Sequence, residues 1–192
     1  MRKQKLMTCV FGLVVAATEL QAAKYAIDAD HTTVSFEVAH LVVSSVEGNF
    51  KKLGGDLNFD PAAIEKSELD AWVDVASVNT DNEKRDKHLR SDDFFAAAKF
   101  PKITLKSKKI EKKSDKNFIM TGALSIHGVT KDVPFDCTYK GAVKAWGKDR
   151  VAFKCVGKIV RQDFGMSFGA LADATPVVGD EVEIKVTVEA IK

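Results

Sequence analysis

The feature that most constrains the fold is an alternation of apolar and polar residues that runs from Lys24 to the end of the chain. In residues 182–189, valine or isoleucine occupies every second position, and charged residues or threonine occupy the others. A period of two is typical of a β-strand with one buried face. The same pattern recurs, with interruptions, in residues 31–43, 69–75, 118–126, 133–139 and 151–159. We therefore predict an all-β domain of about eight strands.

Helical sequence is scarce and cannot cover the apolar face of such a sheet. Only residues 79–95 favour a helix, a short excursion near residues 82–90 that Thr80 or Asp81 could cap and that has no wide apolar stripe. The sheet must therefore cover itself. It can close into an antiparallel barrel, which also removes its edge strands, or it can fold into two packed layers.

Strand length favours a barrel with an internal tunnel. An eight-stranded barrel is either filled by its own side chains or holds one small ligand. Residues 31–43, followed by a turn around Glu47 and Gly48, predict a strand of 13 residues. At about 3.3 Å per residue, this strand would be about 40 Å long, more than a compact, filled barrel requires. We therefore expect an extended eight-stranded barrel.

The first residues have the pattern of a secretory signal. Arg2, Lys3 and Lys5 precede an apolar run in residues 6–17, and small residues follow up to Ala23. The run is shorter than the roughly 20 residues that span a bilayer. We predict that residues 1–22 form a signal peptide cleaved near Ala22 or Ala23, and that residues 23–192 form one exported, periplasmic domain.

Charge argues against nucleic acid as a partner. Removing three basic residues and Glu19 from the 29 basic and 27 acidic residues leaves 26 of each. Binding to phosphates normally needs a clustered basic excess, and lysines 106–113 are better explained as solvating an edge strand and its turn.

Two cysteines, Cys137 and Cys155, remain after the leader with Cys9 is removed. Export would place them in an oxidising compartment. They lie on adjacent predicted strands joined by a turn near Trp146. If those strands pair around the turn, the two sulfurs face each other, which predicts a cross-strand disulfide.

The histidines and hydroxyl residues give little support for a metal centre or for catalysis. No cysteine or second histidine lies two or four positions from His31, His40, His88 or His127. No serine has a local nucleophile signature. We therefore expect no metal, no cofactor and no catalytic residue. His40 shares the apolar parity of its strand, so contact with the head group of a ligand is considered for it.

Four charged residues, Arg85, Asp86, Arg161 and Asp163, are interpreted as a network that pins the helical excursion near the barrel mouth. Trp72 has the opposite parity to its apolar neighbours and Trp146 lies in a turn, so both are assigned to the surface or to a dimer contact.

The residues of apolar parity are the candidate wall of the tunnel. In a hollow barrel, the core and the ligand-binding wall are the same face. The predicted ligand-binding residues are Phe36, Val38, His40, Val73, Phe118, Met120, Phe135, Tyr139, Phe153, Phe164, Met166 and Phe168.

Blocks of sequence resemble a known family. Residues 25–40 (YAIDADHTTVSFEVAH) are similar to the opening strand of the YceI-like, polyisoprenoid-binding proteins. Within residues 77–101, the stretches SVNT, RDKHL, DFF and FP are similar to the family's middle block. Residues 122–131 (GALSIHGVTK) and 161–165 (RQDFG) resemble its third and fourth blocks. The resemblance covers the chain after the leader, in order and with similar spacing.

The resemblance implies a lipocalin-like, extended antiparallel barrel that is exported, is often a homodimer and binds a polyisoprenoid or fatty-chain lipid in its tunnel. The expected function is that of a periplasmic lipid carrier rather than an enzyme. Two alternatives stay open. One is an enzyme acting on the bound lipid, which would need a nucleophile or an acid/base pair facing the tunnel. The other is an interaction module with a filled barrel.

Overall fold

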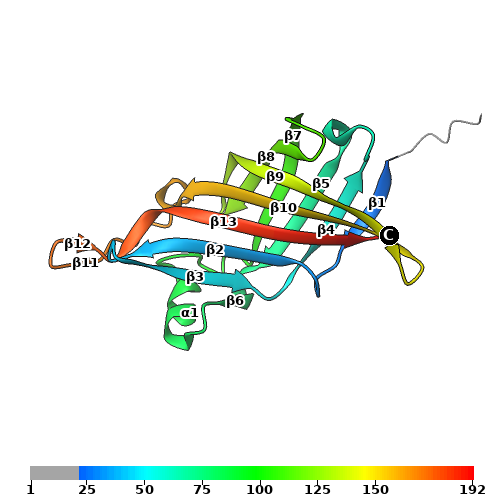
Figure 1. The fold of residues 1–192 in the computed structure, drawn as a ribbon. Helices are drawn as coiled ribbons and strands as arrows, with labels where there is room; N and C mark the ends of the chain where they lie inside the picture. The colour runs from blue at the N-terminus through cyan, green and yellow to red at the C-terminus, as the bar shows by residue number, and fades with distance from the viewer. Residues whose placement is uncertain (1–21) are drawn as a thin grey trace, which may run out of the picture.

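The computed structural model describes residues 22–192, so the predicted signal peptide lies outside the described residues except for Ala22. Within the described part, eight antiparallel strands form a closed barrel, because β1 pairs with both β4 and β13 (Figure 1). The order around the barrel is β1 (Ala23–Ile27), β4 (Leu53–Phe59), β5 (Glu68–Asp74), β7 (Lys102–Lys112), β8 (Asn117–Ile126), β9 (Val129–Ala145), β10 (Lys148–Val160) and β13 (Val178–Ile191).

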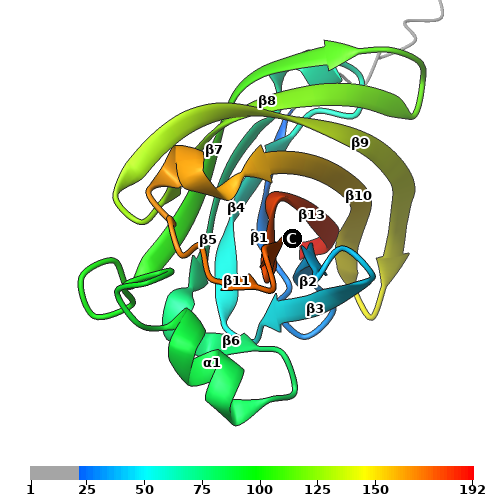
Figure 2. The ribbon, with the colours of Figure 1, turned by 90° about the vertical axis from the view of Figure 1, so that its left-hand side faces the viewer.

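Three further strands extend the sheet beyond this ring. They are β2 (Thr33–His40), β3 (Ser44–Phe50) and β6 (Val78–Asn79). Strand β2 pairs with residues 178–187 of β13, whereas β1 pairs with Ala190 and Ile191 on the same edge of that strand. The ring therefore closes near the C-terminal end of β13, and β2 and β3 form the wall along the rest of it. Figure 2 looks along the barrel and shows this arrangement.

The structure confirms the predicted lipocalin-like barrel with one short helix. Helix α1 (Glu83–Leu89) lies beside β6, outside the ring of strands (Figure 2). Its N-cap is Asn82, whose Oδ1 accepts a hydrogen bond from the N–H of Arg85 at 3.0 Å, so neither of the predicted caps is used. The remaining short elements are η1 (Ile64–Lys66), η2 (Val75–Ser77), η3 (Arg161–Phe164), β11 (Leu171–Ala172) and β12 (Thr175–Pro176).

The prediction of one strand over residues 31–43 is wrong. Strand β2 ends at His40, and Leu41 and Val42 have φ angles of 50° and 64°, so the chain reverses there. The predicted turn at Glu47 and Gly48 lies inside β3. Because left-handed backbone is rare for a β-branched residue, the sequence did not indicate a turn at Val42. The elongation of the barrel comes instead from β9, β13 and β10, which have 17, 14 and 13 residues.

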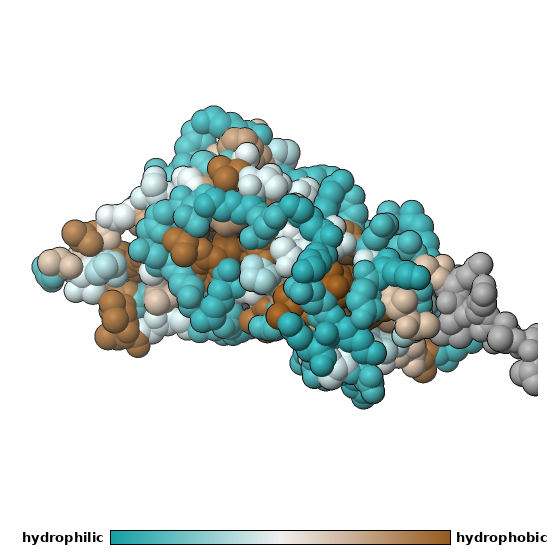
Figure 3. All heavy atoms as spheres, turned by 90° about the horizontal axis from the view of Figure 1, so that it is seen from above, coloured by the Kyte–Doolittle hydropathy of each residue, from teal (hydrophilic) through white to brown (hydrophobic). Residues whose placement is uncertain are grey.

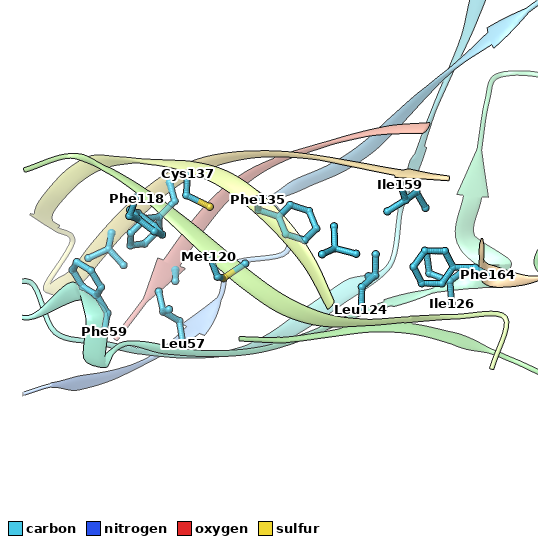
Figure 4. Close-up of a cluster of buried hydrophobic side chains, with 14 of the residues drawn as sticks. Leu57, Phe59, Phe118, Met120, Leu124, Ile126, Phe135, Cys137, Ile159 and Phe164 are labelled. Carbon is cyan, nitrogen blue, oxygen red and sulfur yellow. The ribbon is translucent and has the colours of Figure 1, made fainter. Parts of the chain in front are cut away.

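Aromatic side chains fill the end of the barrel at which the ring closes. The ring centroid of Phe59 lies 5.2 Å from those of Tyr139 and Phe153 and 6.4 Å from that of Tyr25. Phe118 packs against Phe153 in an edge-on contact. Figure 4 shows Phe59 and Phe118 at one end of this cluster and Ile126 and Phe164 at the other. The closed end is therefore a packed core.

Cys137 and Cys155 lie opposite each other on β9 and β10, and their sulfur atoms are 2.03 Å apart, a bonded distance. A bulge sets this register. Near the hairpin turn Ala145 pairs with Lys148, but after Gly141 the pairing shifts by one residue, so that Tyr139 faces Phe153. If the register found near the turn continued without a bulge, Cys137 would face Val156. The bulge therefore positions the two cysteines for bonding.

Candidate functional site

A cavity of about 370 Å³ occupies the part of the barrel away from the closed end. Its wall is formed by β2, β5, β7 and β13, with α1 and the following segment on one side. The volume lies within the range of about 300–1,000 Å³ that is typical of small-molecule sites. The barrel is thus packed at one end and hollow toward the other.

The structure places the predicted wall residues in two groups. Seven of the twelve line the cavity: Phe36, Val38, His40, Val73, Phe135, Met166 and Phe168. The other five do not line it and belong to the buried hydrophobic cluster or pack against it: Phe118, Met120, Tyr139, Phe153 and Phe164. Phe118 lies at the closed end of this cluster, and Phe164 lies at its other end (Figure 4). Alternation identifies residues that point into the barrel, and it carries no information about which part of the interior is filled.

Several lining residues were missed by sequence reasoning. Strand β13 contributes Val182, Ile184, Val186 and Val188, which were identified as one apolar face but were not assigned to the site. Strands β5 and β7 add Leu69, Ala71, Ile103 and Leu105. The signal that could have found them is the same parity rule, applied to every inward position of every strand.

The wall combines short and large side chains. Valines such as Val34 and Val46, together with Ala71, leave open space beside them, and six phenylalanines also line the cavity. Side-chain size alone therefore does not separate the hollow region from the closed end. The strands differ as well, because β2 and β3 lie outside the ring and form part of the wall only here.

Polar groups are few along the wall, and none of the lining residues is acidic in the described part of the chain. The cationic or titratable residues that line it are Arg85, Arg161, His40 and His88. His88 Nε2 lies 2.9 Å from Asp93 Oδ2, and its ring packs edge-on against Phe94 and Phe168. The wall thus carries the positive charges of two arginines and no negative charge from a lining residue of the described part.

The predicted network of Arg85, Asp86, Arg161 and Asp163 is wrong. Arg85 and Asp86 bind Thr80, whereas Arg161 and Asp163 bind other residues far from α1 in sequence. Asp86 Oδ1 accepts from the N–H and hydroxyl of Thr80 at 2.8 and 2.6 Å, and Arg85 donates to the same threonine. These bonds fasten α1 to the end of β6.

Arg161 and Asp163 bind residues outside α1 and β6. The buried Arg161 donates to the carbonyl oxygens of Met166 and Gly179, both at 2.8 Å, and it pairs with Asp180. Asp163 pairs instead with Lys131 at 3.1 Å. Arg161 therefore anchors the loop that carries β11 and β12 against the start of β13.

Three hydroxyl residues line the wall, Thr32, Ser35 and Thr104, and the first two are bonded to the backbone. Thr32 Oγ1 donates to the carbonyl of Glu189, and Ser35 Oγ donates to the carbonyl of Lys185, each at 3.2 Å. Neither is paired with a histidine or carboxylate that could act as a base, which is the arrangement that activates such a nucleophile. This site is built to hold an apolar group.

The two tryptophans differ, because Trp72 is partly buried and is one of the residues that line the cavity, whereas Trp146 is exposed. Trp72 covers Gly54 on the neighbouring strand, and Lys102 Nζ lies 4.2 Å from the centre of its indole ring. Trp146 is 89% exposed at the β9–β10 turn.

A separate cluster of Asp28, His31 and Glu189 brings three potential metal-ligating side chains together at the closed end. Arg150 already supplies a positive charge there, since its Nη1 donates to Asp28 at 3.2 Å and also to Glu189. His31 Nδ1 lies 2.8 Å from the Asp28 carboxylate. We interpret the cluster as an ionic clasp that joins the β1–β2 connection to β10 and β13.

The clasp should make stability depend on pH. The hydrogen bond to Asp28 raises the pKa of His31, and the same bond lowers the pKa of Asp28. A raised histidine pKa stabilises the fold below the imidazole's ordinary pKa of about 6.5, and this contribution is lost as pH rises through the folded value. A lowered aspartate pKa stabilises above about pH 4 and is lost as pH falls.

We therefore expect the melting temperature of the wild type to exceed that of His31→Gln at about pH 5.5 and to converge with it at about pH 8.5. Thermal unfolding followed by circular dichroism across this range measures the difference. Curves that stay parallel from acid to base would contradict the role given to His31.

A model of the YceI-like domain matches residues 25–190. Protein YceI of Salmonella newport is 34% identical over 195 residues, covering 100% of this chain and 99% of that protein. A UPF0312 protein of Vibrio parahaemolyticus is 34% identical over 177 residues, covering 90% of this chain and 89% of its own.

Solved structures show the same architecture. The YceI protein of Campylobacter jejuni has a TM-score of 0.71 and 35% identity, over 96% of this chain and 99% of that one. BcnA of Burkholderia cenocepacia has a TM-score of 0.76 and 26% identity, over 85% and 98%. A polyisoprenoid binding domain from Saccharophagus degradans, 16% identical with a TM-score of 0.66 over 86% and 97%, shares the fold.

Proposed function

We propose that this chain, which belongs to the YceI-like family, binds the hydrocarbon chain of a long apolar lipid in its cavity and carries that lipid through the periplasm. The observation that carries the proposal is the cavity of about 370 Å³, walled by aliphatic and aromatic side chains. The domain of this fold from Saccharophagus degradans is described as polyisoprenoid-binding, which supports a polyisoprenoid or a fatty chain as the ligand class. The predicted signal peptide supports the periplasmic location.

Energetics favour a carrier over a store. Each methylene taken from water contributes about 0.8 kcal/mol, so one five-carbon isoprene unit contributes about 4 kcal/mol. Such lipids reside in membranes, however, and their transfer from one apolar environment to another is close to neutral. The protein therefore shields the hydrocarbon chain during passage through water. Because transfer to a membrane is close to neutral in free energy, the lipid can also be released there.

The charges on the cavity wall disfavour a cationic head group. Two arginines and two histidines line the cavity, and no lining residue of the described part is acidic. A cationic head group would find no partner on this wall. We therefore expect a lipid whose head group is anionic or neutral. Family membership and the backbone-bonded hydroxyls favour binding over catalysis.

Filling the cavity tests the proposal. In Ala71→Phe, a benzyl side chain replaces a methyl group on the wall between Leu69 and Val73. Binding of dansyl-labelled farnesol, measured by fluorescence titration, should weaken at least about tenfold, because the added ring takes the space of the ligand chain. The melting temperature should stay the same or rise, because the ring enters a hollow and not a packed core.

The matched control is Ala142→Phe, which adds the same ring at an exposed position of β9. This variant should bind the probe as the wild type does. If Ala71→Phe also retained full binding, the ligand would have to lie elsewhere and the proposal would fail.

A further inference from the structure

One end of the molecule is almost free of charge. We call it the apolar tip and define it as residues 38–46 and 165–179. These 24 residues contain a single formally charged side chain, Asp173, although 29% of the whole chain is charged. The charged residues that flank the two segments most closely in sequence are Glu37, Glu47, Asp163 and Asp180, and all four are acidic.

The two segments lie together in space. The N–H of Leu41 donates to the carbonyl of Val177 at 3.2 Å, and His40 pairs with Val178. The N–H of Val177 donates in turn to the carbonyl of Ala170. Figure 1 shows the β2–β3 turn and the β11–β12 hairpin at the same end of the barrel, opposite the β9–β10 turn.

The outermost side chains of the tip are apolar and exposed. Val42, Val43 and Leu171 are 76%, 87% and 66% exposed, and Figure 3 shows brown surface at this end of the molecule. Val42 also has a φ of 64°, a conformation that is unfavourable for a β-branched residue and that glycine or asparagine would adopt at lower cost. Neither packing nor turn formation accounts for valine at this position.

The apolar surface continues from the tip into the cavity. His40, Phe168 and Val177 belong to the tip and also line the cavity wall. An apolar chain could pass from the outside to the inside along these residues. Arg161, the charged side chain bonded to the tip, is buried and is bound by backbone carbonyls and Asp180. The exposed residues thus stand at one end of the site and not on an unrelated surface.

We propose that the apolar tip inserts into the surface of a zwitterionic phospholipid bilayer and that the lipid passes between bilayer and cavity at this contact. The inference rests on the proposed function and names the surface on which it operates. The absence of lysine and arginine and the acidic flanks fit a neutral membrane face and not an anionic one. Exposed apolar side chains on protruding turns reach past the head groups.

A second protein is a poorer match for the tip. A stable interface buries about 800 Å² on each partner. Three exposed side chains on two narrow turns offer much less area than this. A bilayer needs no complementary shape, so small protruding tips are sufficient for a weak and reversible contact.

Tryptophan quenching tests which end touches the bilayer. The Val43→Trp variant and the wild type are mixed with vesicles of phosphatidylcholine that carries bromine on its acyl chains. We expect stronger quenching by bromine in the variant than in the wild type, whose tryptophans are Trp72 on β5 and the exposed Trp146 at the opposite end. Equal quenching in both proteins would show that position 43 does not reach the acyl chains, and it would overturn the proposal.

Charge substitutions test the contribution of the tip. Val43→Asp and Leu171→Asp should each weaken sedimentation with phosphatidylcholine vesicles at least tenfold. The control is Val143→Asp, which alters a residue 60% exposed beside the β9–β10 turn and should sediment as the wild type does. Replacing a third of the lipid with phosphatidylglycerol should not strengthen binding. Vesicle binding by the tip variants at wild-type strength would overturn the proposal.

Two controls separate membrane docking from the carrier function and from a contact between two copies of the chain. The tip variants should bind dansyl-labelled farnesol in solution as the wild type does, because Val43 and Leu171 do not line the cavity. If no protein bound the probe while the wild type still sedimented with vesicles, the carrier function would fail and membrane docking would stand. If sedimentation velocity without lipid showed that Val43→Asp converts a dimer to a monomer, the tip would be a contact between copies and docking would fail.

Discussion

Replacement of Phe59 by alanine should lower the free energy of unfolding by about 3–5 kcal/mol, the range for removing a fully packed aromatic ring. Phe59 is 2% exposed and contacts the rings of Tyr25, Tyr139 and Phe153. Its removal leaves a cavity among rigid aromatic neighbours that cannot easily collapse. Urea denaturation followed by circular dichroism measures the change.

Phe36→Ala is the comparison, because the Phe36 ring borders the cavity and is only partly buried. Removing that ring enlarges an existing hollow, so we expect less than half the loss found for Phe59. Equal losses at the two positions would contradict the division of the barrel into a packed end and a hollow one.

Reduction of the bond between Cys137 and Cys155 should lower the free energy of unfolding by about 3 kcal/mol, because the bond closes a loop in the unfolded chain. The two residues are 18 apart in sequence. Urea midpoints with and without dithiothreitol measure the effect. The variant Cys137→Ala, Cys155→Ala should have the same midpoint in both buffers, which separates the effect of the bond from that of the reductant. An unchanged midpoint for the wild type would show that the bond contributes nothing in solution.

Much of the fold could be predicted, because alternation reports directly which side of a strand is buried. In β13 the alternating valines, isoleucine and charged residues define one long strand, and the structure extends it only at its ends. Strand ends were harder to predict. Val42 and Val43 continue the apolar pattern of β2, yet the chain turns there and exposes both of them. Local sequence contains no glycine or asparagine that would indicate this turn.

The pairing of Cys137 with Cys155 depends on a β-bulge that the sequence did not indicate. A hairpin centred on Trp146 and Gly147 would place Cys137 opposite Val156 if pairing were regular. The bulge between Gly141 and Tyr139 moves the register by one residue and brings Cys137 opposite Cys155. The sequence placed the two cysteines on adjacent strands but did not reveal the bulge.

The sequence predicted which side chains of the candidate site point into the barrel, but not how far along the barrel each of them lies. Phe36 and Phe153 have the same inward parity, yet Phe36 lines the cavity and Phe153 lies in the packed core. What separates them is where the ring of strands closes, and this depends on β1 and β2 sharing one edge of β13. The polar contacts of Arg85 and Arg161 were equally hidden, because both arginines donate to backbone carbonyls, which a sequence does not mark.

The sharing of β13 between a packed end and a hollow end has an evolutionary consequence. Substitutions among the aliphatic residues of the hollow end change the shape of the cavity while the aromatic end continues to hold the domain together. Relatives with this barrel can therefore diverge in cavity shape without first acquiring compensating mutations for stability. We expect sequence variation to concentrate on inward positions of β2 and of the first half of β13, and the partners of Phe59 to vary least.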